Sequence, residues 1–187
     1  MTISMETTAD RPMRRRNRCL ARQEALEILL ATEHAVLSTT DAAGVPYGVP
    51  VSPVYLEGKL YFHCLSLPGG RRSDNLLANP RVSVCFIKKQ DTLPDHFSVD
   101  YESVIVSGRA YPVTDAQEWE RALIALCRRH CPEQPTHSVL AEIRKHAKAT
   151  AVWRIEIDSM SGKSRAGSRE RTNKAACEAT TSTCFTG

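Results

Sequence analysis

The sequence predicts a mainly β domain, an antiparallel closed or split barrel with helices at its periphery. About six short apolar segments follow one another at regular spacing, and tight turns that contain glycine join the first three. The chain contains neither a GxGxxG nor a GxxxxGK[ST] motif, so its sequence does not support a Rossmann or P-loop nucleotide site. At 187 residues, one domain with a sizeable core is expected.

The first third of the chain predicts one helix and an antiparallel meander. Apolar residues recur at helical spacing over residues 22–33. The turns Asp41–Gly44 and Glu57-Gly58 then separate three segments with strand character. We expect these strands at 34–40, 45–56 and 59–65.

The middle strand of this meander is unusual because it contains Pro46, Pro50 and Pro53. Proline removes a backbone donor from a β-ladder, so it is confined to edges and bulges. The segment is therefore either an irregular edge strand or a strand whose spare backbone groups face a planar ligand.

The remaining chain predicts a short helix, three more strands and two longer helices. Ser73 is expected to N-cap a helical turn that stops at Asn79-Pro80. Asp115 and Glu118 form a capping-box pattern for a helix that ends by Pro132. The other expected elements are strands at 82–87, 99–113 and 150–158 and a helix at about 138–148.

Charge and composition divide the chain into three parts. Residues 1–17 are expected to form a flexible basic arm, residues 18–159 the barrel domain, and residues 160–187 a polar tail. Much of the net charge of +4 comes from arginines in or beside the arm, which suit a solvated segment or a contact with phosphate or a partner. Elsewhere no basic stripe alternates with aromatic residues, so nucleic acid is not an expected partner.

The cysteines and the hydropathy of the sequence indicate the expected cellular location of the protein. Seven cysteines are scattered without a CxxC pair, which favours reduced thiols over a disulfide framework. No apolar run reaches membrane-spanning length, so we expect a cytoplasmic protein without a membrane partner. Cys127, His130 and Cys131 lie close in sequence, but a zinc site would need further ligands and no metal is expected.

The stretch LYFHCLSLPGGRRSDNL, residues 60–76, combines a histidine with a basic corner. Gly69 and Gly70 precede Arg71 and Arg72 at the expected start of a helix, and helix N-termini and arginine forks both favour phosphate. The alternatives are a solvated arginine pair or ion pairs with Asp74. His63, at the end of a strand, is either a structural residue or part of a site.

No arrangement for nucleophilic or acid/base catalysis is visible in the sequence. His63 and Cys64 are neighbours on a strand and therefore face opposite sides. Paired carboxylates at a catalytic spacing are also missing from the sequence. If the protein is an enzyme, we expect a cofactor to supply the chemistry.

Five motifs, in this order and spacing, resemble one family. They are MRRRNR (13–18), GVPYGVPVSPVY (44–55), LYFHC (60–64), GRRSDNLLANPRVSVCF (70–86) and YESVIVSGRAYPV (101–113). Together they resemble the pyridoxamine 5′-phosphate oxidase-like FMN-binding split barrels, and most closely the nitroimidazole-resistance (Nim-like) branch.

The resemblance implies a homodimer of six-stranded split barrels with a flavin in each of two interface clefts. Arg72 falls where the family usually has lysine, and Arg71 precedes it; both are implied to hold the phosphate. His63 matches a histidine at the edge of the flavin pocket and is the one catalytic candidate. The remaining implied cofactor contacts are Val49, Pro50, Val51, Ser52, Pro53, Ser103 and Val104.

The resulting functional hypothesis is an FMN-dependent oxidoreductase. NAD(P)H would reduce the flavin, and electrons would pass to a small acceptor such as a nitroaromatic or nitroimidazole compound. The alternatives are a flavin- or haem-binding module without turnover, and a split barrel that uses FAD or F420.

Overall fold

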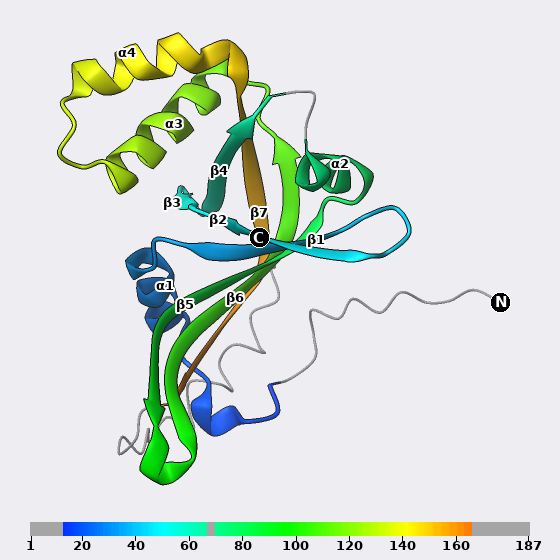
Figure 1. Cartoon of the computed structure of the whole chain (residues 1–187), viewed down its shortest axis with the longest axis vertical. Helices are drawn as coiled ribbons and strands as arrows, with labels where there is room; N and C mark the ends of the chain where they lie inside the picture. The colour runs from blue at the N-terminus through cyan, green and yellow to red at the C-terminus, as the bar shows by residue number, and fades with distance from the viewer. Residues whose placement is uncertain (1–12, 67–69, 166–187) are drawn as a thin grey trace, which may run out of the picture.

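The chain folds into one antiparallel sheet of seven strands with helices around it (Figure 1). The computed structural model describes residues 13–66 and 70–165. The strands are β1 (Ala35–Thr40), β2 (Pro46–Val51), β3 (Val54–Leu56), β4 (Lys59–Leu65), β5 (Arg81–Leu93), β6 (Ser98–Pro112) and β7 (Thr150–Arg165). The predicted class, mainly β with peripheral helices, is confirmed.

Four α-helices and three 3-10 turns complete the described fold. The α-helices are α1 (Arg22–Ala31), α2 (Arg71–Ala78), α3 (Ala116–His130) and α4 (Thr136–His146). The 3-10 turns are η2 (Arg16–Arg18), η3 (Pro94–His96) and η4 (Ala147–Ala149). Among the described residues, no helix is long and apolar enough to cross a membrane.

The sheet has the order β2-β1-β5-β6-β7-β4-β3, and this order corrects the predicted strand count. The strand expected at 45–56 is broken at Ser52 and Pro53, so seven strands form where six were predicted. Its first half pairs with β1 and its second half with β4. Because β2 and β3 are the two edges of the sheet and are consecutive in the chain, the Ser52-Pro53 bend closes the sheet on itself.

Two apolar clusters hold the structure together. The larger one fills the inside of the sheet and is covered by the buried face of α1, which includes Ala25, Ile28 and Leu29. The smaller one lies where α3 packs on β3, β4 and β7, with α4 packed against α3, around Tyr61 and Val152. Alternate strand residues point to these clusters, as the period of a half-buried strand requires.

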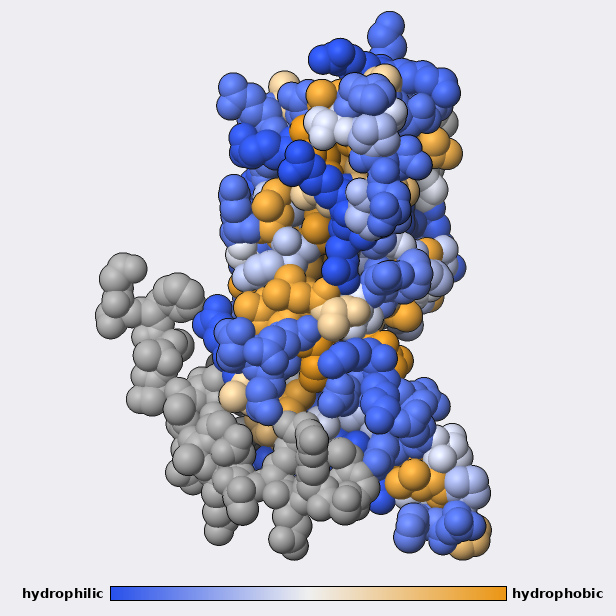
Figure 2. All heavy atoms as spheres, turned by 90° about the vertical axis from the view of Figure 1, so that its left-hand side faces the viewer, coloured by the Kyte–Doolittle hydropathy of each residue, from blue (hydrophilic) through white to orange (hydrophobic). Residues whose placement is uncertain are grey.

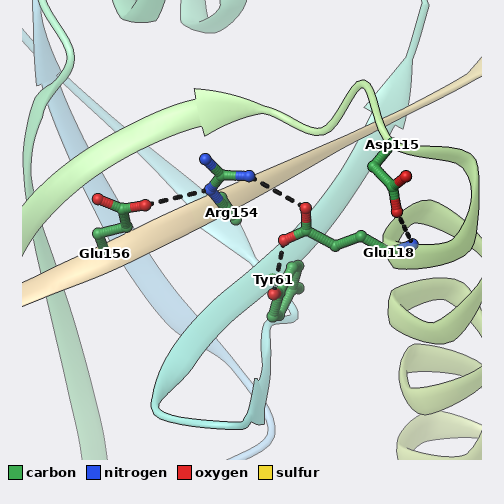
Figure 3. A network of polar contacts seen from close by, with 5 residues as sticks. All are labelled: Tyr61, Asp115, Glu118, Arg154 and Glu156. Atoms are coloured by element: carbon green, nitrogen blue, oxygen red, sulfur yellow. Dashed lines mark hydrogen bonds and ion pairs between the residues drawn. The ribbon is translucent and has the colours of Figure 1, made fainter.

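A polar network fixes α3 to the sheet (Figure 3). The Asp115 carboxylate caps α3 by accepting a 2.7 Å hydrogen bond from the Glu118 backbone N–H, as the capping pattern predicts. The Glu118 side chain does not complete the box. It accepts a 2.8 Å hydrogen bond from the Tyr61 hydroxyl and pairs with Arg154 at 3.0 Å. Arg154 also contacts Glu156 at 3.3 Å.

Helix α2 begins earlier than predicted. Gly70, not Ser73, is the N-cap residue, and the Gly70 carbonyl accepts a 2.8 Å hydrogen bond from the Ser73 backbone N–H. Ser73 is buried inside the helix, where its hydroxyl lies 3.9 Å from the Cys64 sulfur. Extended backbone at a residue without a side chain is enough to start the helix, so the serine cap is not needed. The helix ends at Ala78, before Asn79-Pro80, as expected.

Strand β7 runs past residue 159, the predicted end of the barrel domain. Strand β7 continues to Arg165, where it pairs with Tyr101 of β6, so residues 160–165 belong to the sheet and not to a tail. Gly162 permits this, because a Cβ there would lie 2.7 Å from the Ala25 Cβ on α1.

The last residues of the predicted arm lie beside the sheet. The 3-10 turn η2 includes the last two residues assigned to the arm, and Cys19 directly after it forms a β-bridge to Lys163 of β7. This end of the basic segment is therefore attached to the sheet. The rest of the predicted arm, 1–12, and of the tail, 166–187, lies outside the described residues.

Candidate functional site

A cavity of about 220 Å³ opens where the Ser52-Pro53 bend, here called the barrel-closing bend, meets β4 and α2. Its lining combines apolar residues with basic and hydroxyl groups. The lining residues are His34, Pro50, Val51, Ser52, Phe62, His63 and Arg72. Two regions that the sequence places apart, the proline-rich strand and the arginine corner, therefore meet at one cavity.

The bend contributes one wall of the cavity. The β1–β2 ladder ends at the pair Ala35–Val51, and β3 begins at Val54, so Ser52 and Pro53 belong to neither ladder. Pro50 and Val51 supply apolar surface, and the Ser52 hydroxyl lies 2.9 Å from Nδ1 of His34. The β-pairing of the chain is therefore interrupted at Ser52 and Pro53, next to the cavity.

Strand β4 and helix α2 contribute an aromatic ring, an imidazole and a guanidinium group to the cavity. Phe62 is buried, whereas the next residue, His63, points outward, as strand alternation requires. The Arg72 guanidinium carbon lies 5.2 Å from the Phe62 ring centroid. The Arg72 Nε atom is buried and has no hydrogen-bond partner among the described residues. A buried donor without a partner is costly, so this atom marks a place where an acceptor would bind.

The electrostatic character of the cavity is basic. None of its lining residues is acidic, and Arg72 forms no ion pair within the described ranges 13–66 and 70–165. Burial lowers the pKa of His63, and the nearby Arg72 and His130 lower it further. His63 is therefore a neutral hydrogen-bonding group at pH 7, and the positive charge at the site comes from Arg72.

The two arginines of the corner do not converge. The Arg71 guanidinium carbon lies 4.7 Å from the ring centroid of Tyr47 on β2, and Arg71 does not line the cavity. Consecutive residues of a helix point about 100° apart, which explains the separation. Only Arg72 of the predicted pair lies at the cavity.

Part of the predicted ring-binding segment faces elsewhere. Val49 is half-buried and packs on the main core. Pro53 lines a second cavity of about 90 Å³, which lies beside α1 and also includes Leu30 and Arg129. Figure 2 shows apolar side chains gathered around the middle of the face that carries α1. Arg129 at this cavity donates a 3.3 Å hydrogen bond to the Thr32 carbonyl, so its position has a structural explanation.

The two predicted residues of the long strand lie away from the cavity. Val104 is fully buried in the core, between Phe86 and Gly162 of the neighbouring strands. Ser103 is half-buried and, one residue away, points to the other face of the sheet. Neither lines the cavity of this chain, and their contact with a cofactor stays a prediction.

Sequence reasoning missed His34 and Phe62. The signal for His34 lies in the hairpin register, because the residue before Ala35 faces the residue after Val51. Phe62 is visible only once α2 is placed over β4. Among the described residues, no group of three His, Cys, Asp or Glu side chains is placed to hold a metal ion.

A family model described as pyridoxamine 5′-phosphate oxidase matches residues 21–164. The chain belongs to this family. Residues 13–20 and 165 are the only described residues outside the match, so the sheet and the cavity both lie within the pyridoxamine 5′-phosphate oxidase region.

Solved structures of other proteins agree with this family and fold. A candidate 5-nitroimidazole antibiotic resistance protein from Bacteroides thetaiotaomicron is 26% identical, with a TM-score of 0.64 over 78% of this chain and 86% of that one. An FAD-binding protein from Mesorhizobium loti is 24% identical, with a TM-score of 0.58 over 80% and 98% of the two chains.

A third solved structure extends the range of ligands among these relatives. An FAD- and haem-binding protein from Mycobacterium smegmatis is 20% identical, with a TM-score of 0.66 over 81% of this chain and 74% of that one. At these identities the last two structures show the shared split-barrel fold alone. No curated protein matches the chain.

Proposed function

We propose that this protein is an FMN-dependent oxidoreductase, reduced by NAD(P)H and passing electrons to a small acceptor such as a nitroaromatic or nitroimidazole compound. The family supplies the general expectation of a flavin-binding split barrel. The nitroimidazole-resistance relative supports the choice of acceptor.

The observation that carries the proposal is the state of Arg72. Its Nε atom is buried beside the cavity without a partner among the described residues, and no lining residue is acidic. A phosphate group would accept from this guanidinium with charge assistance and would offset its charge. The residues present therefore fit the phosphate of FMN, with Arg72 as its cation in place of the lysine usual in the family.

The apolar wall fits the ring of the same cofactor. Pro50, Val51 and Phe62 provide apolar surface, and the Ser52 bend lies outside the β-ladders. Bound FMN would supply the capacity to take up and release electrons. The chain's part is to bind and orient it, and His63, neutral at pH 7, would hold a hydrogen bond at the edge of the site.

A flavin- or haem-binding module without turnover is the second candidate. Two histidines line the cavity, and no lining residue is an acid, so a catalytic acid/base pair is not evident there. The relative that binds FAD and haem favours this candidate. A split barrel that uses FAD or F420 in place of FMN is the remaining alternative.

The proposal includes a homodimer with the flavin at its interface, and one face of the sheet supports it. In two adjacent cross-strand rows of β2, β1, β5 and β6, the side chains that point outward are small or apolar, whereas Arg81 and Arg109 point the same way at one end of the sheet. One cross-strand row is Gly48, Ser38, Ser83 and Ser107, and the next is Pro50, Val36, Cys85 and Ile105.

The second of these uncharged rows is continuous with the cavity, because Pro50 belongs to both. Interfaces are depleted of charge at their centre, and 43% of Val36 and 46% of Ile105 are exposed in the single chain. A second copy that covered this face would bring its own residues to the cavity. Ser103 points to the same side as Ile105, so its predicted flavin contact would be made across the dimer.

The dimer is tested by charge on this face. Ile105→Lys should convert a dimer to a monomer in sedimentation, whereas Ala141→Lys on the exposed side of α4 should leave the dimer unchanged. A wild-type protein that sediments as a monomer at high micromolar concentration would exclude the homodimer.

The function is tested on the purified protein. Its visible spectrum, release of the chromophore by heat and mass measurement identify the cofactor, and FMN is expected. Anaerobic mixing with NADH and with NADPH should then bleach the flavin, and a nitroaromatic compound should restore its colour. A protein that takes up no flavin would overturn the proposal; bound flavin that neither donor bleaches would favour the binding module.

We also propose a cytoplasmic location. The five cysteines that the structure describes are all free thiols. A reducing compartment, where NAD(P)H is available, accounts for this state.

A further inference from the structure

The β1–β2 hairpin stops pairing abruptly at the cavity. Its register advances from Thr40–Pro46 to Ala35–Val51, and the next pair would be His34 with Ser52. The ladder does not include these two residues. Their side chains are nevertheless in contact, with Nδ1 of His34 lying 2.9 Å from the Ser52 hydroxyl oxygen.

The contact between His34 and Ser52 matters because the Ser52-Pro53 bend has few backbone hydrogen-bond donors. Pro53 has no backbone N–H, so Ser52 carries the one backbone donor of the two-residue bend. Ser52 lies outside both ladders and lines the cavity together with His34. His34 and Ser52 continue the series of non-hydrogen-bonded pairs that includes Thr40–Pro46 and Val36–Pro50, so the Ser52 backbone N–H points away from β1.

We propose that His34 is a positioning residue for the cofactor: its bond to the Ser52 hydroxyl fixes the orientation of the bend, so that Ser52 presents its backbone N–H to the ring of the bound flavin. The inference rests on the proposed function and deepens it. His34 is exposed, and an exposed side-chain hydrogen bond adds little to folding stability. Its main effect is therefore on ligand binding.

Conservative and disruptive substitutions of the two residues distinguish this role from others. An asparagine at position 34 places an amide near the position of the imidazole Nδ1, so His34→Asn should keep the contact, whereas His34→Ala removes it. Ser52→Ala removes the other partner and leaves the imidazole. If His34 acts through Ser52, the double variant should be no worse than either alanine variant.

The experiment measures the FMN dissociation constant and the flavin reduction potential of these variants beside the wild type. His34→Ala and Ser52→Ala are each expected to raise the dissociation constant about fivefold to tenfold, the size of one neutral hydrogen bond, and to shift the potential. His34→Asn should restore most of the affinity. His137→Ala, an exposed histidine on α4, is the matched control and should change neither quantity.

The outcomes separate the inference from the proposed function. Wild-type protein that binds no flavin overturns the proposed function and this inference with it. Wild-type protein that binds flavin no more tightly than His34→Ala overturns the inference alone. Additive losses in the double variant would also overturn it, because the two residues would then act independently. A lower melting temperature with unchanged affinity and potential would show a structural role only.

Discussion

Two polar clusters begin on the same face of β4, two residues apart, and they differ in how completely they are paired. Around Tyr61, the Glu118 and Arg154 side chains form a closed network in which each charge has an opposite charge nearby (Figure 3). Around His63, the basic group is Arg72, and no carboxylate among the described residues forms an ion pair with it. Arg154 has two carboxylates within 3.3 Å, although its Nε atom makes no hydrogen bond, whereas Arg72 has no carboxylate partner among the described residues.

This difference separates a structural role from a binding role without reference to any relative. Native proteins pair nearly all their buried polar groups, so an unpaired group points to something that binds there. Changes in the closed network should therefore alter stability, and changes at the cavity should alter affinity.

The largest effect is expected from Glu118→Ala. It leaves Arg154 without its closest partner and Tyr61 without its acceptor, in a place where only 15% of the Glu118 side chain is exposed. We expect a loss of about 3 kcal/mol in the free energy of unfolding, measured by urea denaturation. Glu142→Ala on α4, whose pairs with Lys145 and His146 are exposed, is the control and should cost less than about 0.5 kcal/mol.

The second effect is on affinity. Arg72→Ala should weaken FMN binding by about 1.5–3 kcal/mol, the value of a hydrogen bond to a charged group, with little loss of stability. Arg71→Ala is its matched control, since Arg71 stacks on Tyr47 outside the cavity. Isothermal titration would measure both. Equal losses in the two variants would show that the arginines act together, against their separation in the structure.

Tyr61→Phe should have a smaller effect on stability, about 1 kcal/mol, because it removes one hydrogen bond to Glu118. Burial and the neighbouring Glu118 raise the pKa of Tyr61 from 10.0 to about 12. The folded state thus holds the proton more tightly, and this stability is present below pH 10 and lost between pH 10 and pH 12. Denaturation at about pH 9 and about pH 11 should show a steeper fall for the wild type than for the variant.

The smallest effect is expected at His63. Its pKa is lowered from 6.5 by burial and by Arg72 and His130, so the unfolded chain binds the proton more readily than the folded one. Stability should therefore decrease as the pH falls below 6.5, and His63→Gln should flatten this decrease. Melting temperatures between about pH 7 and pH 5 would measure it. An identical pH dependence in the variant would mean that other groups cause the loss.

The elements of the fold were largely predictable, because most of them depend on local patterns. The strand at 59–65 and the end of α2 before Pro80 follow from alternation and from proline sterics. The break at Ser52 was not predicted, because prolines tolerate an edge and a bend equally well. The length of β7 depends on packing of Gly162 against α1, a contact between distant parts of the chain.

The site was predictable only in part, and for a physical reason. That the proline-rich strand and Arg72 form one site was predicted. Which individual side chains line the cavity depends on the direction in which each of them points. Helical periodicity already separates Arg71 from Arg72, and strand alternation already separates Ser103 from Val104. His34 required the register of the hairpin, which a sequence pattern does not specify on its own.

The barrel-closing bend has a consequence for how these chains behave when crowded. Edge strands with free N–H and C=O groups invite strands of other molecules to add to them, and this is a common route to aggregation. Here the two edge strands are β2 and β3, and Pro46, Pro50 and Pro53 remove donors along this same segment. An incoming strand would find an interrupted ladder there. Pro50, which forms part of the cavity wall, thus also helps to protect the sheet from polymerising.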